Sequence, residues 1–228
     1  MLQGVIKRRI LPKLFGNKRL SRLEGTLGVR AVGYRSYIGG KWTEYGRLEF
    51  DFMLAQGLEP EHVLLDIACG SLRAGVHFIP YLEPGHYLGI EKEKDLIRQG
   101  LAKELASDVR EQQRPELVVS SEFEFERFSK QADYSLAWSL FTHLIAPEVE
   151  LCLRNLRANV GEGHQFYATF LPGSAEQNES RSHAHAAFYY PREDLEAMGE
   201  RNGWNCEYLG EISSERDMKM RMMKFTPA

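Results

Sequence analysis

The segment Val63–Gly75, with the sequence Val-Leu-Leu-Asp-Ile-Ala-Cys-Gly-Ser-Leu-Arg-Ala-Gly, decides the fold of this chain. It begins with apolar residues interrupted only by Asp66, a run too short for a helix and followed by turn-forming residues. This pattern predicts a strand, Val63–Ile67, buried on both faces of a parallel sheet. Small residues follow, and a helix is predicted from about Leu72. The low side-chain bulk of the turn and the free N–H groups of the helix would let a ligand approach the backbone.

A second acidic residue follows the next predicted strand. The apolar run His86–Ile90 ends at Glu91, which lies 25 residues after Asp66. In nucleoside-binding α/β folds a carboxylate at this place accepts hydrogen bonds from the ribose hydroxyls. The alternative is an ordinary surface acid before the charged helix predicted over Lys92–Ala106.

The first segment resembles motif I of the class I S-adenosylmethionine-dependent methyltransferases, and Glu91 matches their motif II. Motif I usually reads Asp-x-Gly-x-Gly-x-Gly, and here two of its three glycines are replaced, by Ala68 and Leu72, while Gly70 is kept. The run Cys-Gly-Ser-Leu-Arg resembles a bacterial subgroup in which a serine and an arginine take over the end of the loop. A dinucleotide-binding Gly-x-Gly-x-x-Gly is absent, which disfavours a nicotinamide-dependent oxidoreductase.

The stretch Asp133–His143 resembles motif IV of the same family, where a strand ends beside the site of methyl transfer. Carboxyl ends of parallel strands converge on the ligand crevice, so Trp138, Ser139 and His143 are expected near both substrates. Of these three, only His143 has a proton-transfer group that titrates near neutral pH. The alternative for His143 is a structural role in packing and loop hydrogen bonds.

Two further segments are candidates for cofactor contacts. The aromatic and glycine-rich stretch 33–46 is expected to be a loop that covers the cofactor through Tyr37 and Trp42, or whose aromatic residues pack on the core. After the strand predicted over Glu116–Ser120, Glu122 and Phe123 occupy the place where this family contacts the adenine. The alternative for Phe123 is a core position, which is the more common role of an aromatic residue at this place.

The irregular segment Pro172–Ala187 lies where many methyltransferases build the acceptor pocket. It contains His183 and His185, which we take as candidate general bases after His143. Two histidines without a third ligand are a weak metal signal, so no metal is predicted.

The remaining patterns complete an α/β fold. They indicate helices over Leu48–Ala55, Leu72–Leu82, Pro147–Asn159 and Arg192–Asn202, and strands over His164–Leu171, Trp204–Ile212 and Met218–Thr226. The last two strands are separated only by the polar turn Ser213–Asp217, which is too short for a parallel crossover, so they should pair antiparallel. We therefore expect a Rossmann-like, doubly wound, mostly parallel seven-stranded sheet that ends in an antiparallel hairpin.

Composition limits the partners of the protein. The 228 residues, 43% of them hydrophobic, suffice for one domain, expected over residues 31–228 after a basic extension over residues 1–30. Residues 1–25 hold seven bases and one acid, while the rest of the chain has 22 bases and 31 acids. The acidic body argues against nucleic-acid binding, and the basic front is either a solvated tail or a peripheral membrane contact. Three scattered cysteines and no secretory signal indicate a reduced, cytoplasmic protein.

The resemblance implies a methyltransferase that takes S-adenosylmethionine as cofactor and a small-molecule acceptor, with O-methylation of a sugar, lipid-linked or secondary-metabolite hydroxyl favoured. The alternative is a methyltransferase-like binding or scaffold protein without activity. No pattern indicates an oligomeric state. The expected cofactor-binding residues are Tyr37, Trp42, Asp66, Ala68, Cys69, Gly70, Ser71, Arg73, Glu91, Glu122, Phe123, Trp138 and Ser139.

Overall fold

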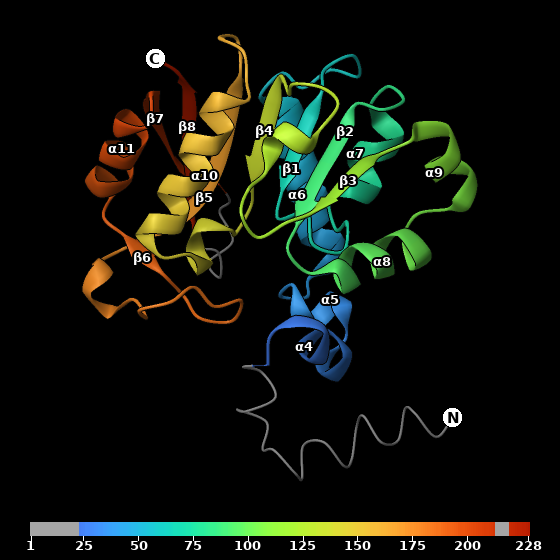
Figure 1. The fold of residues 1–228 in the computed structure, drawn as a ribbon, viewed down its shortest axis with the longest axis horizontal. Helices are drawn as coiled ribbons and strands as arrows, with labels where there is room; N and C mark the ends of the chain where they lie inside the picture. Colours follow the sequence, from blue (N-terminus) through green and yellow to red (C-terminus); the bar gives the residue numbers. More distant parts are fainter. Residues whose placement is uncertain (1–22, 213–218) are drawn as a thin grey trace.

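A computed structural model describes residues 23–212 and 219–228 and contains one mixed β-sheet (Figure 1). Along the sheet the strands are β3 (Glu116–Val119), β2 (Tyr87–Glu91), β1 (Leu64–Ile67), β4 (Tyr134–Ala137), β5 (Gln165–Pro172), β8 (Arg221–Pro227) and β7 (Trp204–Glu211). The pairs from β3 to β5 are parallel, and β8 is antiparallel to both β5 and β7. This path of seven strands confirms the predicted fold. A two-residue strand, β6 (Tyr189–Tyr190), also pairs with β5.

Helices cover both faces of the sheet. They are α4 (Gly25–Val32), α5 (Tyr34–Tyr37), α6 (Trp42–Ala55), α7 (Gly75–Tyr81), α8 (Lys94–Lys103), α9 (Ser107–Gln113), α10 (Ala146–Ala158) and α11 (Arg192–Arg201). Short 3₁₀ turns are η2 (Phe125–Arg127), η3 (Phe141–His143) and η4 (Ala175–Gln177). Neighbouring side chains of a strand point to opposite faces. Leu65 accordingly lies in a cluster with α10 and α11, and Leu64 in a cluster with α6 and α7.

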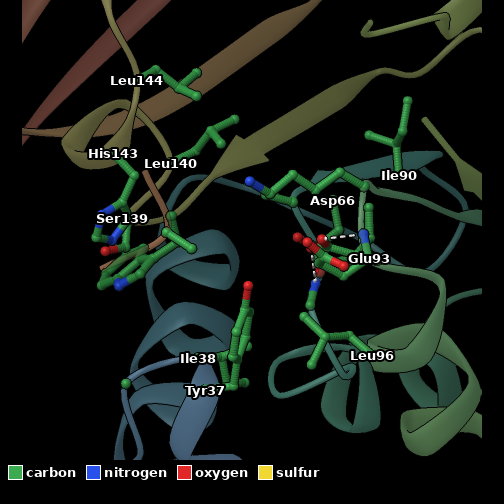
Figure 2. Close-up of a pocket in the computed structure, with 18 of the residues that line it drawn as sticks. Tyr37, Ile38, Asp66, Ile90, Glu93, Leu96, Ser139, Leu140, His143 and Leu144 are labelled. Atoms are coloured by element: carbon green, nitrogen blue, oxygen red, sulfur yellow. Dashed lines mark hydrogen bonds between the residues drawn. The ribbon is translucent and has the colours of Figure 1, made fainter. Parts of the chain in front are cut away.

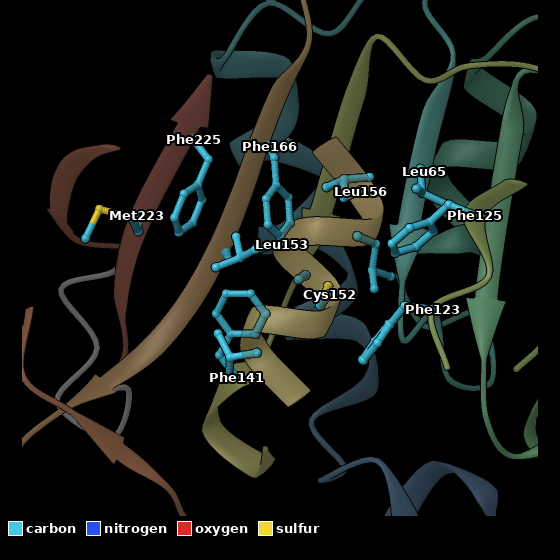
Figure 3. Close-up of a cluster of buried hydrophobic side chains, with 14 of the residues drawn as sticks. Leu65, Phe123, Phe125, Phe141, Cys152, Leu153, Leu156, Phe166, Met223 and Phe225 are labelled. Carbon is cyan, nitrogen blue, oxygen red and sulfur yellow. The ribbon is translucent and has the colours of Figure 1, made fainter. Parts of the chain in front are cut away.

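The core under α10 follows from a helical repeat of apolar residues. Val149, Cys152, Leu153 and Leu156 recur at three- and four-residue spacing and are all buried. Figure 3 shows this helix seated between the aromatic side chains of β5 and β8 and those that follow β3. The close packing fixes the turns after β3 and β4, which carry several predicted site residues.

Several predicted boundaries are wrong. The stretch 33–46, expected as a loop, contains α5 and the start of α6, which begins six residues before the expected Leu48. Gly39 and Gly40, with φ of +90° and +67°, end one helical turn and allow the next helix to start at Trp42.

Two helices after the central strand are shorter than predicted. Helix α7 begins at Gly75 instead of Leu72, because Leu72 has a left-handed φ of +65°. The helix expected over Lys92–Ala106 is α8, with the unpredicted α9 as a separate helix after it. The strand expected over Met218–Thr226 is β8, and the turn Ser213–Asp217 lies outside the described residues.

Helices α4 and α5 form a cap, residues 23–40, at the sheet edge where the parallel strands have their carboxyl ends (Figure 1). Val29 and Tyr37 of the cap pack on Leu96 of α8. Most of the predicted basic extension lies outside the described residues, although its last six residues belong to α4. None of the described helices is long and apolar enough to cross a membrane.

Candidate functional site

A cavity of about 770 Å³ opens at the carboxyl ends of β1, β2 and β4. Strands β1 and β4 are neighbours whose connections run to opposite sides of the sheet, and such a switch point is where open α/β sheets bind ligands. The predicted site residues that line the cavity are Tyr37, Asp66, Ala68, Cys69, Gly70, Arg73, Glu91, Glu122, Phe123, Trp138, Ser139, His143, His183 and His185.

Two predicted residues do not line the cavity. Ser71 is completely buried beneath α8, whose Gly100 comes so near that a Cβ there would lie 2.5 Å from the Ser71 carbonyl oxygen. Trp42 instead packs outside the cavity, with its ring edge against Tyr34 and the Arg35 guanidinium 4.7 Å from the ring centre. Both residues therefore support the surroundings of the site.

The turn after β1 keeps a glycine-like backbone at all three motif positions. Ala68, Gly70 and Leu72 have φ of +64°, +58° and +65°. A residue with a side chain adopts this left-handed region at a cost of about 1–2 kcal/mol. A Cβ at Gly70 would also come within 3.2 Å of Ile38 in the cap. The turn thus keeps the left-handed backbone conformation although two of the three motif glycines are replaced.

Asp66, the third of the four residues of β1, has a buried carboxyl group that accepts a hydrogen bond of 2.7 Å from the Tyr87 hydroxyl. Burial raises the pKa of Asp66 to about 7; the bond from Tyr87 opposes the rise, and the nearby Glu49 adds to it. A ligand cation placed near Asp66 would favour its ionised form.

Glu91 ends β2 and faces the same turn. Its two carboxylate oxygens accept the Gly70 amide at 3.1 Å and the Glu93 amide at 2.8 Å. Burial raises the pKa of Glu91 to about 7, and these two amide bonds oppose the rise. Since a carboxylate accepts about four hydrogen bonds, Glu91 has capacity for further donors. Glu91 thus lies beside the turn, at the end of the strand next to β1.

Arg73 is held by Glu49, an acidic residue that the sequence patterns did not indicate. Its Nε and Nη2 atoms donate to Oε1 of Glu49 in α6, at 3.0 and 2.6 Å, and both side chains are buried. Its Nη1 atom donates to the Ile38 carbonyl oxygen at 3.1 Å. Burial raises the pKa of Glu49, and Arg73 opposes this. Arg73 therefore joins the cap to α6, with two of its five N–H donors still free of these bonds.

His143, the last residue of η3, is oriented by a backbone carbonyl. Its Nδ1 atom lies 2.7 Å from the Ala186 carbonyl oxygen, which only accepts, so Nδ1 carries the proton of the neutral ring. Burial lowers the pKa of His143, with smaller contributions from His185, Lys92 and His183, whereas the bond to Ala186 opposes the fall. His143 is consequently neutral near pH 7, with an unprotonated Nε2 atom.

His183 and His185 contact the cap. The Nδ1 atom of His183 accepts the His185 amide at 3.0 Å, and its Nε2 atom lies 3.8 Å from Oε2 of Glu24. The His185 ring packs edge-on against Tyr37 at 4.8 Å between ring centres. Figure 2 shows Tyr37 standing between His143 and Ser139 on one side and Asp66 and Glu93 on the other. Among the described residues, no group of three or more His, Cys, Asp or Glu could hold a metal ion.

The turn after β3 is fixed by α10. Asn155 donates to the carbonyl oxygens of Glu122 and Phe123, at 3.1 and 3.2 Å. Phe123 is buried and contributes both to the cavity wall and to the core. At the end of β4, the buried Nε1 atom of Trp138 has no hydrogen-bond acceptor within the described part of the chain.

A scan against protein-family models found no match for the chain. Its structure nevertheless resembles solved structures over most of its length. Magnesium protoporphyrin IX methyltransferase from Synechocystis PCC 6803, solved with bound S-adenosylmethionine, has a TM-score of 0.61 at 12% identity, covering all of this chain and 95% of that one. The glycopeptide N-methyltransferase MtfA, also complexed with S-adenosylmethionine, gives 0.63 at 14% identity over 80% and 94%.

A third similar structure is an S-adenosylmethionine-dependent methyltransferase from Clostridium acetobutylicum ATCC 824, with a TM-score of 0.61 at 11% identity over 80% of this chain and 92% of that one. At these identities the likeness concerns the fold. The chain therefore has the Rossmann-like methyltransferase fold, with a cavity at its switch point.

Proposed function

We propose that this protein is an S-adenosylmethionine-dependent methyltransferase that methylates a hydroxyl group of a small molecule. The observation that carries the proposal is the meeting of Asp66, the left-handed turn around Gly70 and Glu91 at one wall of the cavity. The similar structures support it, since all three are methyltransferases and two hold this cofactor.

The residues present fit that cofactor. Glu91 would accept hydrogen bonds from the ribose hydroxyls, and Asp66 would face the cationic amino-acid part. At Gly70 the missing side chain leaves the turn open where a Cβ would crowd the cap. Phe123 and Glu122, held by α10, would border the adenine. When bound, S-adenosylmethionine supplies a methyl group on a positively charged sulfur, so its transfer depends mainly on alignment with the acceptor.

For a hydroxyl acceptor, we assign the general base to His143. Its neutral Nε2 atom would take the hydroxyl proton as the oxygen gains the methyl group, and would later release that proton to water. The Ala186 carbonyl holds the ring in the required tautomer. His185 and His183 remain weaker candidates, because their contacts go to the cap and to each other.

Release of S-adenosylhomocysteine, measured with a panel of sugar, phenolic and lipid-linked alcohols, tests the activity. We expect product release with at least one hydroxylated acceptor and a rate about 10²- to 10⁴-fold lower in His143→Asn. Absence of release across the panel, in a protein that binds the cofactor, would favour the binding or scaffold alternative. An undiminished rate in His143→Asn would remove this residue from the mechanism.

A further inference from the structure

The cap contacts the loop beside the candidate base through the packing of Tyr37 on His185 and through a hydrogen bond from the loop to Glu24. Glu24 precedes α4, yet its carboxylate makes no capping bond to that helix. Instead, Oε1 accepts the amide of Ala184, 160 residues away, at 2.8 Å. Burial raises the pKa of Glu24, but the Ala184 amide, Lys92 and His183 outweigh this and lower it overall. Glu24 is therefore an ionised acceptor held on the segment 182–186.

The same segment holds His143 from its other end. The Ala186 carbonyl oxygen binds Nδ1 of His143 at 2.7 Å, and the His183 amide donates to the His143 carbonyl oxygen at 3.1 Å. Segment 182–186 thus lies between the cap and the imidazole, with hydrogen bonds to both. A displacement of the cap would be transmitted to the group that sets the tautomer and direction of His143.

We propose that Glu24 is a positioning residue for methyl transfer: by holding the Ala184 amide it keeps segment 182–186 in the place where Ala186 orients His143. The position of the cap over the cavity and the orientation of the His143 ring would then change together. This inference rests on the proposed function for its catalytic meaning. The contacts that it invokes are measurable without turnover.

Two conservative variants separate the effect of the Glu24 charge from the effect of its side-chain length. Glu24→Gln keeps an oxygen at the same distance but removes the charge. Glu24→Asp keeps the charge but shortens the side chain, and aspartate at this position prefers to cap its own helix. Arg30→Ala is the matched control, because Arg30 joins α4 to Asp95 at 3.5 Å, away from segment 182–186.

The test is an NMR titration of the histidine rings in the full chain, together with amide hydrogen exchange over segment 182–186. The charged and titratable groups facing His143 are Lys92, His183 and His185. Loosening of the segment has two opposed effects on the pKa of His143, because exposure of the ring raises it and loss of the Ala186 bond lowers it. The tautomer is the clearer signal, because the Ala186 carbonyl holds the proton of the neutral ring on Nδ1. In Glu24→Asp we expect a tautomer protonated on Nε2 to appear at high pH, together with faster exchange at Ala184. Glu24→Gln and Arg30→Ala should resemble the wild type.

Two results would overturn the proposal. One is a Glu24→Asp protein whose His143 tautomer and Ala184 exchange match the wild type. The other is a Glu24→Gln protein as perturbed as Glu24→Asp, which would make charge, and not the hydrogen bond, the cause. Calorimetry with S-adenosylhomocysteine separates this inference from the proposed function. A wild type that fails to bind S-adenosylhomocysteine contradicts the proposed function, whereas the NMR result still tests whether Glu24 orients His143.

Discussion

The turn after β1 predicts opposite effects for two substitutions to glycine. Ala68 and Leu72 have nearly equal left-handed φ angles, so glycine relieves about 1–2 kcal/mol at either position. Glycine also gives the unfolded chain more freedom, which removes about 0.4–1 kcal/mol of that gain. Ala68 is partly exposed and loses little packing. Ala68→Gly should therefore raise the free energy of unfolding by about 0.5 kcal/mol.

Leu72 differs because its side chain is fully buried, in the cluster on the α6 and α7 face. Truncating a buried leucine to alanine costs about 2.7–5 kcal/mol. After the backbone relief, Leu72→Gly should lower the free energy of unfolding by about 3 kcal/mol. The same packing explains why leucine occupies a position that its backbone angle disfavours.

Urea unfolding followed by circular dichroism measures both effects. The matched control is Ala102→Gly on the exposed side of α8, which should lower the free energy of unfolding by about 1 kcal/mol. If Ala68→Gly destabilises the protein as much as Ala102→Gly does, the turn does not have the left-handed conformation on which the site depends.

Three further predictions concern the buried charges and the base. Glu49→Ala should lower the free energy of unfolding by about 3–5 kcal/mol in the same urea assay, because it leaves the Arg73 guanidinium buried without its carboxylate; a loss below about 1 kcal/mol would contradict a buried pair. Burial raises the pKa of Asp66 to about 7, above the 3.8 of an ordinary aspartate, so its contribution to stability is present below pH 4 and is lost as the pH rises through 7. Thermal unfolding from pH 4 to 8 should therefore show wild type losing stability relative to Asp66→Asn, and parallel curves would refute the raised pKa. His143→Asn should bind S-adenosylhomocysteine with unchanged affinity in calorimetry, since we place this ring on the acceptor side; a large loss of affinity would assign it to the cofactor.

The mostly parallel sheet, its closing antiparallel pair and the edge where the cavity lies could be predicted because buried parallel strands are short apolar runs that end in recognisable turns. Asp66 and Glu91 follow directly from that reading. The conformation of Ala68 and Leu72 could not be predicted from residue type, since both residues prefer negative φ, and only the packed structure imposes the other sign.

Other parts of the site depend on contacts between distant residues. Glu49 could not be recognised because an acidic residue in a helix is normally exposed, and no local pattern relates it to Arg73. In α6 it shares the buried face of the helix with Phe50 and Met53. The bond from Ala184 to Glu24 joins residues that no local pattern relates. The two short helices of the cap were not predicted, because the many glycines of this part of the sequence indicate a loop.

Calorimetric titration of S-adenosylmethionine into the wild type, Glu91→Ala and Glu111→Ala tests the central claim most directly. Glu111 lies on the exposed surface of α9 and controls for the loss of one acidic charge. We expect binding by the wild type, unchanged affinity in Glu111→Ala, and about 10- to 100-fold weaker binding in Glu91→Ala, as expected for lost hydrogen bonds to a charged acceptor. A wild type that gives no binding heat at several temperatures, or a Glu91→Ala protein of unaltered affinity, would contradict the account.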